Sequence, residues 1–288
     1  MRLLHHLPRL ALLMALTVAL APGGAGAAVI AYEGFGYGAG ADLSGQNGGT
    51  GWAGAWNNQG GAPTLTTAPG LGFGALAVTP GAASTAVVVT NDPGAKITTY
   101  TRSLATAFGT DGTTTYLSFL LRPDSGFDFY GGLNLGGGLF IGKSGTPVTT
   151  YGLETGGANI ASSSVVATAG EAVFLVLRAQ FLAGNDVLDL FVNPTLGGAE
   201  PLLADSEMSN VDLALTDLLY INNSGGWTID EIRVGSSFAD VAPVQVSSVP
   251  EPAMLALVLL ALSAMAFTRL SGKVRQRLPT KVDRCKWQ

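Results

Sequence analysis

The segment EAVFLVLRAQFLAGNDVLDLFVNP, residues 171–194, decides the fold class. Apolar side chains recur at every second position, which is the period of a β-strand, and Gly184-Asn185 interrupts them where a turn is expected. The first strand has Val173, Leu175, Leu177, Ala179 and Phe181 on one face, and Phe174, Val176, Arg178 and Gln180 on the other. The partner strand continues with Leu188, Leu190 and Val192. The segment therefore predicts an antiparallel β-hairpin.

The rest of residues 28–243 follows the same pattern, with short apolar runs separated by Gly, Asn, Asp and Pro. No stretch in this region has convincing amphipathic helical spacing. We expect further strands at 28–33, 71–78, 84–90, 115–122, 127–135, 148–154, 217–222 and 227–234. Many short strands joined by glycine-rich turns predict an all-β fold, an antiparallel two-sheet sandwich.

The start of the chain has the features of an export signal. Arg2 and Arg9 make the first residues basic, and the run from 10 to 20 is apolar on every helical face. Ala25-Gly26-Ala27 has the small-x-small pattern of a signal cleavage site. We therefore expect residues 1–27 to be a signal peptide, with Ala25 and Ala27 recognised at the cut, and the protein to be exported.

Charge and residue composition exclude several classes of function. Residues 28–249 contain 18 acidic but only 6 basic side chains, so no nucleic-acid partner is expected. His5 and His6 lie in the expected signal peptide, and Cys285 lies near the C-terminus. A body without His or Cys has no disulfides, no metal site with His or Cys ligands, and no His base or Cys nucleophile. We expect no cofactor.

A second apolar run lies near the C-terminus. Residues 253–268 carry no charge, and a helix at ~1.5 Å per residue would reach ~24 Å there, against a ~30 Å hydrocarbon core. Snorkelling by Arg269 and Lys273 can cover the difference. We expect residues 244–249 to be a linker, 250–277 to contain a transmembrane helix, and 278–288 to be a basic cytoplasmic tail.

The order of Pro250-Glu251-Pro252, an apolar run and Arg269 resembles the PEP-CTERM sorting signal of Gram-negative bacteria. The resemblance covers about residues 249–277. It implies an exosortase-type membrane protease as partner, which cuts at or near the Pro-Glu-Pro and passes the protein to the cell envelope or an extracellular polysaccharide matrix. Here the basic residues are spread out and the chain continues to Gln288. A permanent single-pass membrane anchor is therefore the alternative.

Three segments of the body look like the ends of concanavalin A-like (LamG-type) jelly rolls. They are AYEGFGYGAGADLSGQNGGTGWAGAW at 31–56, LFVNPTLGGAEP at 190–201 and IDEIRVGSSFADVAP at 229–243. The resemblance implies that the sandwich is a jelly-roll domain spanning 28–243, with both ends of the domain meeting in one sheet. Exported proteins with a PEP-CTERM signal often carry such domains.

Two motifs suggest enzymatic chemistry but lack its required context. GGLFIGKS, residues 137–144, has the spelling of a P-loop, yet Gly145 and Pro147 follow where a phosphate-binding helix would begin. A glycoside hydrolase needs two cooperating carboxylates. The nearest pairs, Asp230 with Glu231 and Asp186 with Asp189, are expected on opposite strand faces. We therefore expect no catalytic residues, and a hydrolase acting on matrix glycans is the alternative.

Two binding questions stay open at this stage. Calcium could be held by loop oxygens around Asp124, Asp128, Asp186 or Asn193, although no spacing resembles an EF-hand. Trp52 and Trp56 either form a stacking platform for sugar rings, with Asn57, Asn58 and Gln59 as hydrogen-bond partners, or fill the core, and the core is favoured. The sequence thus indicates an exported surface or matrix protein that binds polysaccharide or has a purely structural or adhesive role.

Overall fold

The computed structural model describes residues 29–61, 63–85, 97–145 and 147–245. The chain separates into two compact units, Met1–Gln245 and Val246–Gln288. The second unit lies outside the described residues, as do the expected signal peptide and the expected transmembrane segment with its Pro-Glu-Pro motif and Arg269. Within the described ranges, no helix is both long and apolar enough to cross a membrane.

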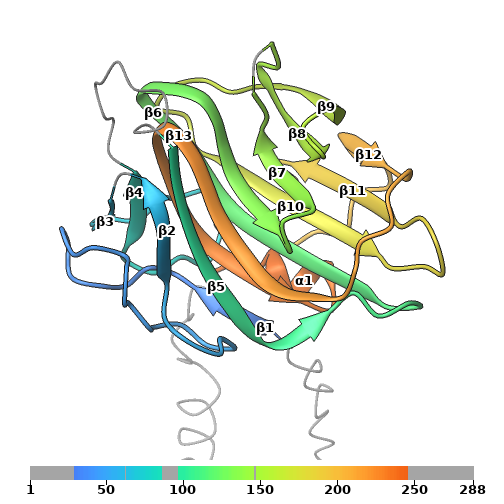
Figure 1. Ribbon diagram of the computed structural model, residues 1–288, viewed down its shortest axis with the longest axis horizontal. Coiled ribbons are helices and arrows are strands. Elements are labelled where there is room, and N and C mark those ends of the chain that lie inside the picture. Colours follow the sequence, from blue (N-terminus) through green and yellow to red (C-terminus); the bar gives the residue numbers. More distant parts are fainter. Residues whose placement is uncertain (1–28, 62, 86–96, 146, 246–288) are drawn as a thin grey trace, which may run out of the picture. The chain divides into compact units, whose positions relative to one another are not determined.

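The described body is built almost wholly from antiparallel strands, which confirms the expected fold class (Figure 1). Its elements are β1 Val29–Glu33, β2 Asn57–Gly61, β3 Thr64–Thr67, β4 Ala82–Thr85, β5 Ile97–Phe108, β6 Thr114–Leu135, β7 Leu139–Lys143, β8 Thr150–Thr155, β9 Asn159–Val166, β10 Val173–Gln180, β11 Val187–Val192, β12 Ser206–Met208, β13 Thr216–Gly235 and the one-turn helix α1 Phe238–Val241.

Two long strands, β6 and β13, connect the two layers of the fold. The first half of β6 pairs with β10 and with the second half of β13, whereas its second half pairs with β7 and with the first half of β13. One layer, here called sheet A, contains β12, β11, β10, β6, β13, β4 and β3, with β1 also on β13. The other layer, sheet B, contains β2, β5, β13, β6, β7, β8 and β9 (Figure 1). The sandwich is therefore jelly-roll-like, but its two layers form one continuous hydrogen-bonded sheet.

The main core lies between the two layers. Sheet A contributes Leu117, Phe119, Leu175, Leu177, Leu188 and Leu190, and sheet B contributes Tyr100, Leu133, Ile141, Leu153, Leu219 and Ile221. A second cluster covers the other face of sheet A and contains Leu71, Leu120, Phe174, Val176, Phe191, Phe238 and Val241. Sheet A is thus buried on both faces, which explains why β10 is apolar on both sides.

The expected hairpin is confirmed in detail. β10 and β11 pair antiparallel, with Leu177 opposite Leu190. The two side-chain faces predicted for β10 separate as expected, because Leu175 belongs to the main core and Phe174 to the second cluster. The chain ends of the body also meet in one sheet, where Tyr32 of β1 is paired with Arg233 of β13.

Several expected strand boundaries are wrong. Residues 71–78 form a loop whose Leu71 and Leu76 cover sheet A, so their apolar character reflects packing rather than strand pairing. The strands expected at 115–122 and 127–135 are one strand, β6, and those at 217–222 and 227–234 are likewise one strand, β13. The body also extends past residue 243, because the Gln245 amide donates to the Ala75 carbonyl at 2.8 Å.

Candidate functional site

Trp52 and Trp56 pack against protein groups rather than forming a platform for sugars. Trp56 is 1% exposed and belongs to the main core, where its indole N–H donates to Glu33 at 3.1 Å. Trp52 is half-buried, and its indole N–H donates to the Tyr32 carbonyl at 2.9 Å. The two rings lie 6.1 Å apart and tilted by 42°, with the Arg102 guanidinium carbon 4.8 Å from the Trp52 ring centroid. Trp56 thus lies in the main core, and the partly buried Trp52 packs against it.

Arg102 and Glu33 form a buried ion pair at the centre of this region. Arg102 extends inward from β5, is 2% exposed, and pairs with Glu33 through Nη1. Its Nε donates to the Gly54 carbonyl at 2.7 Å, and its Nη2 donates to Asn47 Oδ1 at 2.9 Å and to the Gly48 carbonyl at 2.8 Å. The side chain therefore binds three separate points of the loop segment 34–56, which has little regular secondary structure.

The acid pair expected to point in opposite directions lies instead at an irregularity in β13. Glu231 has φ of 54°, and the register of β13 against β6 shifts between Asp230 and Arg233, so simple alternation does not apply here. Asp230 accepts hydrogen bonds from the Leu71 amide and the Glu231 amide, both at 2.7 Å. Burial, reinforced by the negative charge of Glu231, raises the pKa of Asp230 to about 8.

An acid with a perturbed pKa often marks an active site, but Asp230 is not accessible, and neither is its neighbour Glu231. Asp230 and Glu231 are both 0% exposed. Glu231 accepts from the Tyr32 hydroxyl at 3.0 Å and the Thr79 amide at 2.5 Å, and it pairs with Arg233. A hollow of about 380 Å³ beside this network is lined by Val29, Tyr32, Thr50, Ala77, Val78, Thr79 and Arg233, and by neither acid. The acids therefore hold the 71–79 loop on sheet A.

The loop residues considered as calcium ligands bind other protein groups. Asp186 accepts from the amides of Leu182 and Leu213, Asp124 pairs with Arg122, and Asn193 accepts from the Phe174 amide. Across the described part of the chain, no three His, Cys, Asp or Glu side chains gather to hold a metal ion. The side chain of Asp128 is not described.

The P-loop spelling is a strand. Residues Leu139–Lys143 form β7, paired on one side with β6 and on the other with β8, and the Lys143 amine donates to the Phe129 carbonyl. A phosphate cradle needs a loop followed by a helix, so this segment cannot form one.

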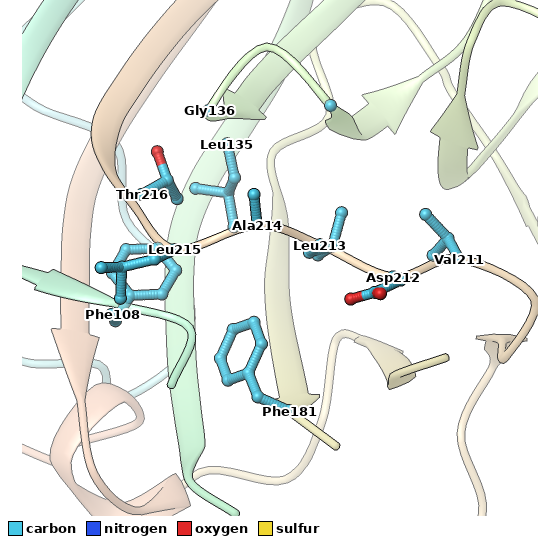
Figure 2. A pocket seen from close by; sticks show the side chains of 11 residues that line it. Phe108, Leu135, Gly136, Phe181, Val211, Asp212, Leu213, Ala214, Leu215 and Thr216 are labelled. Atoms are coloured by element: carbon cyan, nitrogen blue, oxygen red, sulfur yellow. The ribbon is translucent and has the colours of Figure 1, made fainter. Parts of the chain in front are cut away.

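An apolar cleft of about 200 Å³ opens at one end of the main core (Figure 2). Phe108, Leu135 and Phe181 face it from the strand ends, and the segment 211–216 runs across it. Asp212 is the one charged residue in its lining. Such a lining offers few hydrogen-bonding groups, so the cleft is a gap at the end of the core and a poor fit for a sugar.

The outer face of sheet B, which points away from the main core, carries a different set of groups. Tyr100, Ile221, Leu133, Ile141 and Leu153 pair across the sheet and enter the core, so their strand neighbours point outward. One outward row runs Thr101, Tyr220, Asn134, Phe140, Glu154 and Ile160; the next runs Thr99, Asn222, Gly132, Gly142, Gly152 and Ser162. Hydroxyls, amides, aromatic rings and bare backbone thus cross six adjacent strands.

The glycines in the second row are required by close backbone approach. A Cβ on Gly132 would lie 2.1 Å from the Ile141 carbonyl oxygen, and one on Gly142 would lie 2.2 Å from the Gly131 carbonyl oxygen. Beside them the rings of Tyr130 and Phe140 meet edge to face, with centroids 6.0 Å apart. The glycines therefore let neighbouring strands approach closely, and an aromatic pair lies beside them.

A hollow of about 340 Å³ lies at the β5 side of this face. It is lined by Ala53, Gly54, Ala55, Asn57, Thr101, Arg102, Ser103 and Leu218. Asn57 is exposed, and Gln59 donates to the Thr101 hydroxyl at 3.1 Å, whereas Asn58 turns to the hydroxyl of Tyr100. Two of the three polar residues after Trp56 thus lie at this face, although the tryptophan itself does not.

One acceptor on the outer face has no partner. Asn134 Oδ1 is buried and receives no hydrogen bond from the described residues, although its row neighbour Tyr220 lies on the adjacent strand. Buried acceptors are nearly always satisfied by protein or by a bound molecule. Sequence reasoning missed this face, because it becomes visible only once the pairing of β5 to β9 and β13 is known. The single hint is that Gly132, Gly142 and Gly152 recur at equal spacing.

Comparison with known proteins finds no matching family model and no matching curated protein. Solved structures with similar folds include an endo-β-1,4-glucuronan lyase from the fungus Trichoderma reesei (12% identity, TM-score 0.42, covering 74% of this chain and all of that one). Others are domain 4 of AbnA, a GH43 arabinanase from Geobacillus stearothermophilus (11%, 0.45, 73% and 93%), and the VIP36 exoplasmic domain (10%, 0.37, 62% and 87%). At these identities and TM-scores, the similarity supports no statement about function.

Proposed function

We propose that this protein is an exported component of the cell envelope or extracellular matrix that binds polysaccharide without cleaving it. The binding surface in this proposal is the outer face of sheet B. The observation that carries it is the pair of rows across six strands, from Thr101 to Ile160 and from Thr99 to Ser162, beside the hollow at Asn57.

The chemistry of these rows suits sugar chains. Sugars present hydroxyl groups around their edges and C–H groups on their faces, so they need amide and hydroxyl partners together with aromatic rings. Asn57 and Asn222 offer the first kind of group and Tyr220 offers the second, and all three are at least partly exposed. Thr101 and Phe140 contribute less, because they are only 8% and 7% exposed. The broad, open arrangement favours a chain lying across the strands over a small molecule enclosed in a pocket.

The absence of cleavage is proposed because no accessible acid pair lies on this face among the described residues. Glycoside hydrolysis by the usual route needs one acid and one base flanking the scissile bond. By strand pairing, Glu154 is the carboxylate within the two rows. Asp230 and Glu231 are enclosed in sheet A. Release of reducing sugar that is lost in Asp230→Asn would instead support the hydrolase alternative.

Binding should depend on residues of the outer face. We expect Tyr220→Ala and Asn57→Ala each to weaken binding to a soluble polysaccharide ligand by about tenfold, since each removes one stacking or hydrogen-bonding contact worth ~1–1.5 kcal/mol. Affinity electrophoresis in polysaccharide-containing gels measures this loss. Asn185→Ala, at an exposed asparagine in the β10–β11 turn of sheet A, is the matched control and should bind normally. Trp56→Ala, by contrast, should act through loss of folding.

Sorting through the C-terminal signal is also part of the proposal. An exosortase that cuts near Pro250-Glu251-Pro252 would remove the apolar run, Arg269 and everything after them. We expect the mature envelope-associated protein to begin at Ala28 and to lack its C-terminal residues. Intact mass spectrometry of the protein measures both ends at once. A mature species that still ends at Gln288 would mean a permanent membrane anchor and no processing.

A further inference from the structure

We infer that the outer face of sheet B selects uncharged polysaccharides and rejects polyanionic ones such as uronate or sulfated chains. The inference rests on the proposed function and names its ligand class. It follows from where the positive charges of the body are, what each of them binds, and which charge is left on the face.

Five cationic side chains belong to the described residues, and all five are engaged internally. Arg102 pairs with Glu33, Arg122 with Asp124, Arg178 with Asp189 and Glu200, and Arg233 with Glu231, while Lys143 donates to the Phe129 carbonyl. A site for carboxylate or sulfate groups normally presents Arg or Lys with free donors, because the charged ligand must recover its lost hydration.

The positions and directions of these cationic side chains also keep them away from the outer face of sheet B. Arg102 stands on β5 but points inward, on the same strand face as Tyr100 and Leu104 of the main core. Lys143 is paired with Gly131 and Tyr151, in the inward row of β6, β7 and β8. Arg178 belongs to β10 of sheet A. No described cation therefore reaches the two outward rows.

The charge that remains on the face is negative. Glu154 lies in the first row, between Phe140 and Ile160, and none of the described residues forms a hydrogen bond or ion pair with its carboxylate. The whole body carries 18 acidic and 6 basic residues, so its general field also repels polyanions. Lys96, the sixth basic residue, lies outside the described residues, so the test includes the variant Lys96→Ala.

Most side chains that a ligand would contact on the outer face of sheet B are uncharged. The hollow beside the rows has Asn57, Thr101 and Ser103 in its lining, and the rows add Tyr220 and Asn222. Arg102 also lines this hollow, but it is 2% exposed and its guanidinium is bound to Glu33 and to the loop segment 34–56. Neutral amides and hydroxyls exchange hydrogen bonds with sugar hydroxyls at little desolvation cost, whereas they cannot compensate a buried carboxylate without a cation. The face thus matches a neutral glycan in both polarity and sign of charge.

The test compares two panels of soluble polysaccharides with the exported protein. The neutral panel is a mixed-linkage β-glucan, a galactomannan, a xyloglucan and dextran; the acidic panel is alginate, polygalacturonate and dextran sulfate. We expect binding to at least one neutral polymer that changes by less than about twofold between 50 and 500 mM NaCl, since no ion pair is involved. We expect no detectable binding to the acidic panel, with or without Lys96→Ala.

A charge-reversal variant tests the reason for the selectivity. Glu154→Lys places a cation within the first row and should create salt-sensitive binding to alginate, whereas Glu207→Lys, on β12 of sheet A, makes the same change in net charge away from the face. Only the first variant is expected to gain binding.

The outcomes separate this inference from the proposed function. Binding to acidic polymers alone, or equally to both panels, lost in Tyr220→Ala, would overturn the selectivity while leaving polysaccharide binding in place. Alginate binding gained equally by Glu154→Lys and Glu207→Lys would also overturn it, because the face would then have no special part. Binding to no polymer in either panel would overturn both proposals.

Discussion

Arg102→Met is expected to be among the most destabilising single changes in the body. It removes the guanidinium from a pocket in which Glu33 stays buried, leaving a carboxylate without its counter-charge. Breaking one side of a buried ion pair costs about 3–5 kcal/mol, which is a large part of the ~5–15 kcal/mol that stabilises a typical protein. For a domain of this size the unfolding temperature should fall by roughly 10 °C.

The loss should also disorder the loop segment 34–56 before the rest unfolds. Arg102 donates to Gly54, Asn47 and Gly48, and its guanidinium lies over the rings of Trp52 and Trp56. We expect near-ultraviolet circular dichroism from the tryptophans to decrease in Arg102→Met at temperatures where the far-ultraviolet strand signal is still intact. Thermal unfolding monitored at both wavelengths measures the two effects.

A matched control and a double variant separate charge from packing. Arg122→Met removes a side chain that is 35% exposed from its ion pair with Asp124, and it should cost less than about 1 kcal/mol. Adding Glu33→Gln to Arg102→Met removes the stranded charge and should recover at least about 1 kcal/mol. If Arg102→Met is no more harmful than Arg122→Met, the buried pair does not organise this region.

The β10–β11 hairpin could be predicted from sequence because its signal is local. Alternating apolar residues define both strands, and Gly184 allows the turn, with φ of 113°. The same reasoning fails for β5 and β9, in which Thr and Ser alternate with few large apolar residues. These strands are held by their neighbours in sheet B, and a sequence window contains no information about such neighbours.

The error at 71–78 has a different origin. Leu71 and Phe73 have strand-like spacing, but they and Leu76 pack on the outside of sheet A while the Leu71 amide donates to Asp230. The partner is 159 residues away in sequence. Apolar periodicity reports burial and not hydrogen-bond partners, so a loop that covers a sheet looks the same as a strand within it.

The functional residues were harder to predict than the fold. The sequence makes Trp52 and Trp56 candidates because large aromatics often stack on sugars. In the structure their indole N–H groups donate instead to the Tyr32 carbonyl and to Glu33. The outer face of sheet B is assembled from residues between 99 and 222, and each row takes one residue from each of six strands. None of these residues belongs to a recognisable sequence motif, and only the strand register shows that they lie on one face.

The free energy of unfolding should depend on pH through Asp230. Its pKa rises from 3.8 in an unfolded chain to about 8 in the folded protein, chiefly because burial disfavours the charged form. Between these two values the folded state keeps a proton that the unfolded state has released. Stability therefore falls as pH rises from about 4 to about 8, with a slope of at most ~1.4 kcal/mol per pH unit, and levels off above.

Asp230→Asn should flatten this dependence. The amide cannot ionise, so the variant avoids the cost of holding a negative charge beside Glu231. Its NH₂ group replaces one of the two carboxylate oxygens and accepts no hydrogen bond, so only one of the Leu71 and Glu231 amides keeps its acceptor. At pH 5 we expect the variant to be less stable than the native protein by ~1–2 kcal/mol, the value of one lost hydrogen bond. At pH 9 we expect the order to reverse, with a total relative change of order 3–5 kcal/mol.

Urea unfolding at pH 5, 7 and 9 measures these differences, and Ser118→Ala is the control. Ser118 lies on β6 opposite Arg233, and its hydroxyl donates to the Val241 carbonyl at 2.7 Å. Its loss removes a buried hydrogen bond without changing any titratable group, so the variant should be destabilised by the same amount at every pH. Two parallel stability curves for native protein and Asp230→Asn would mean that Asp230 is ionised throughout. In that case its contacts with Leu71 and Glu231, rather than its proton, would hold the 71–79 loop in place.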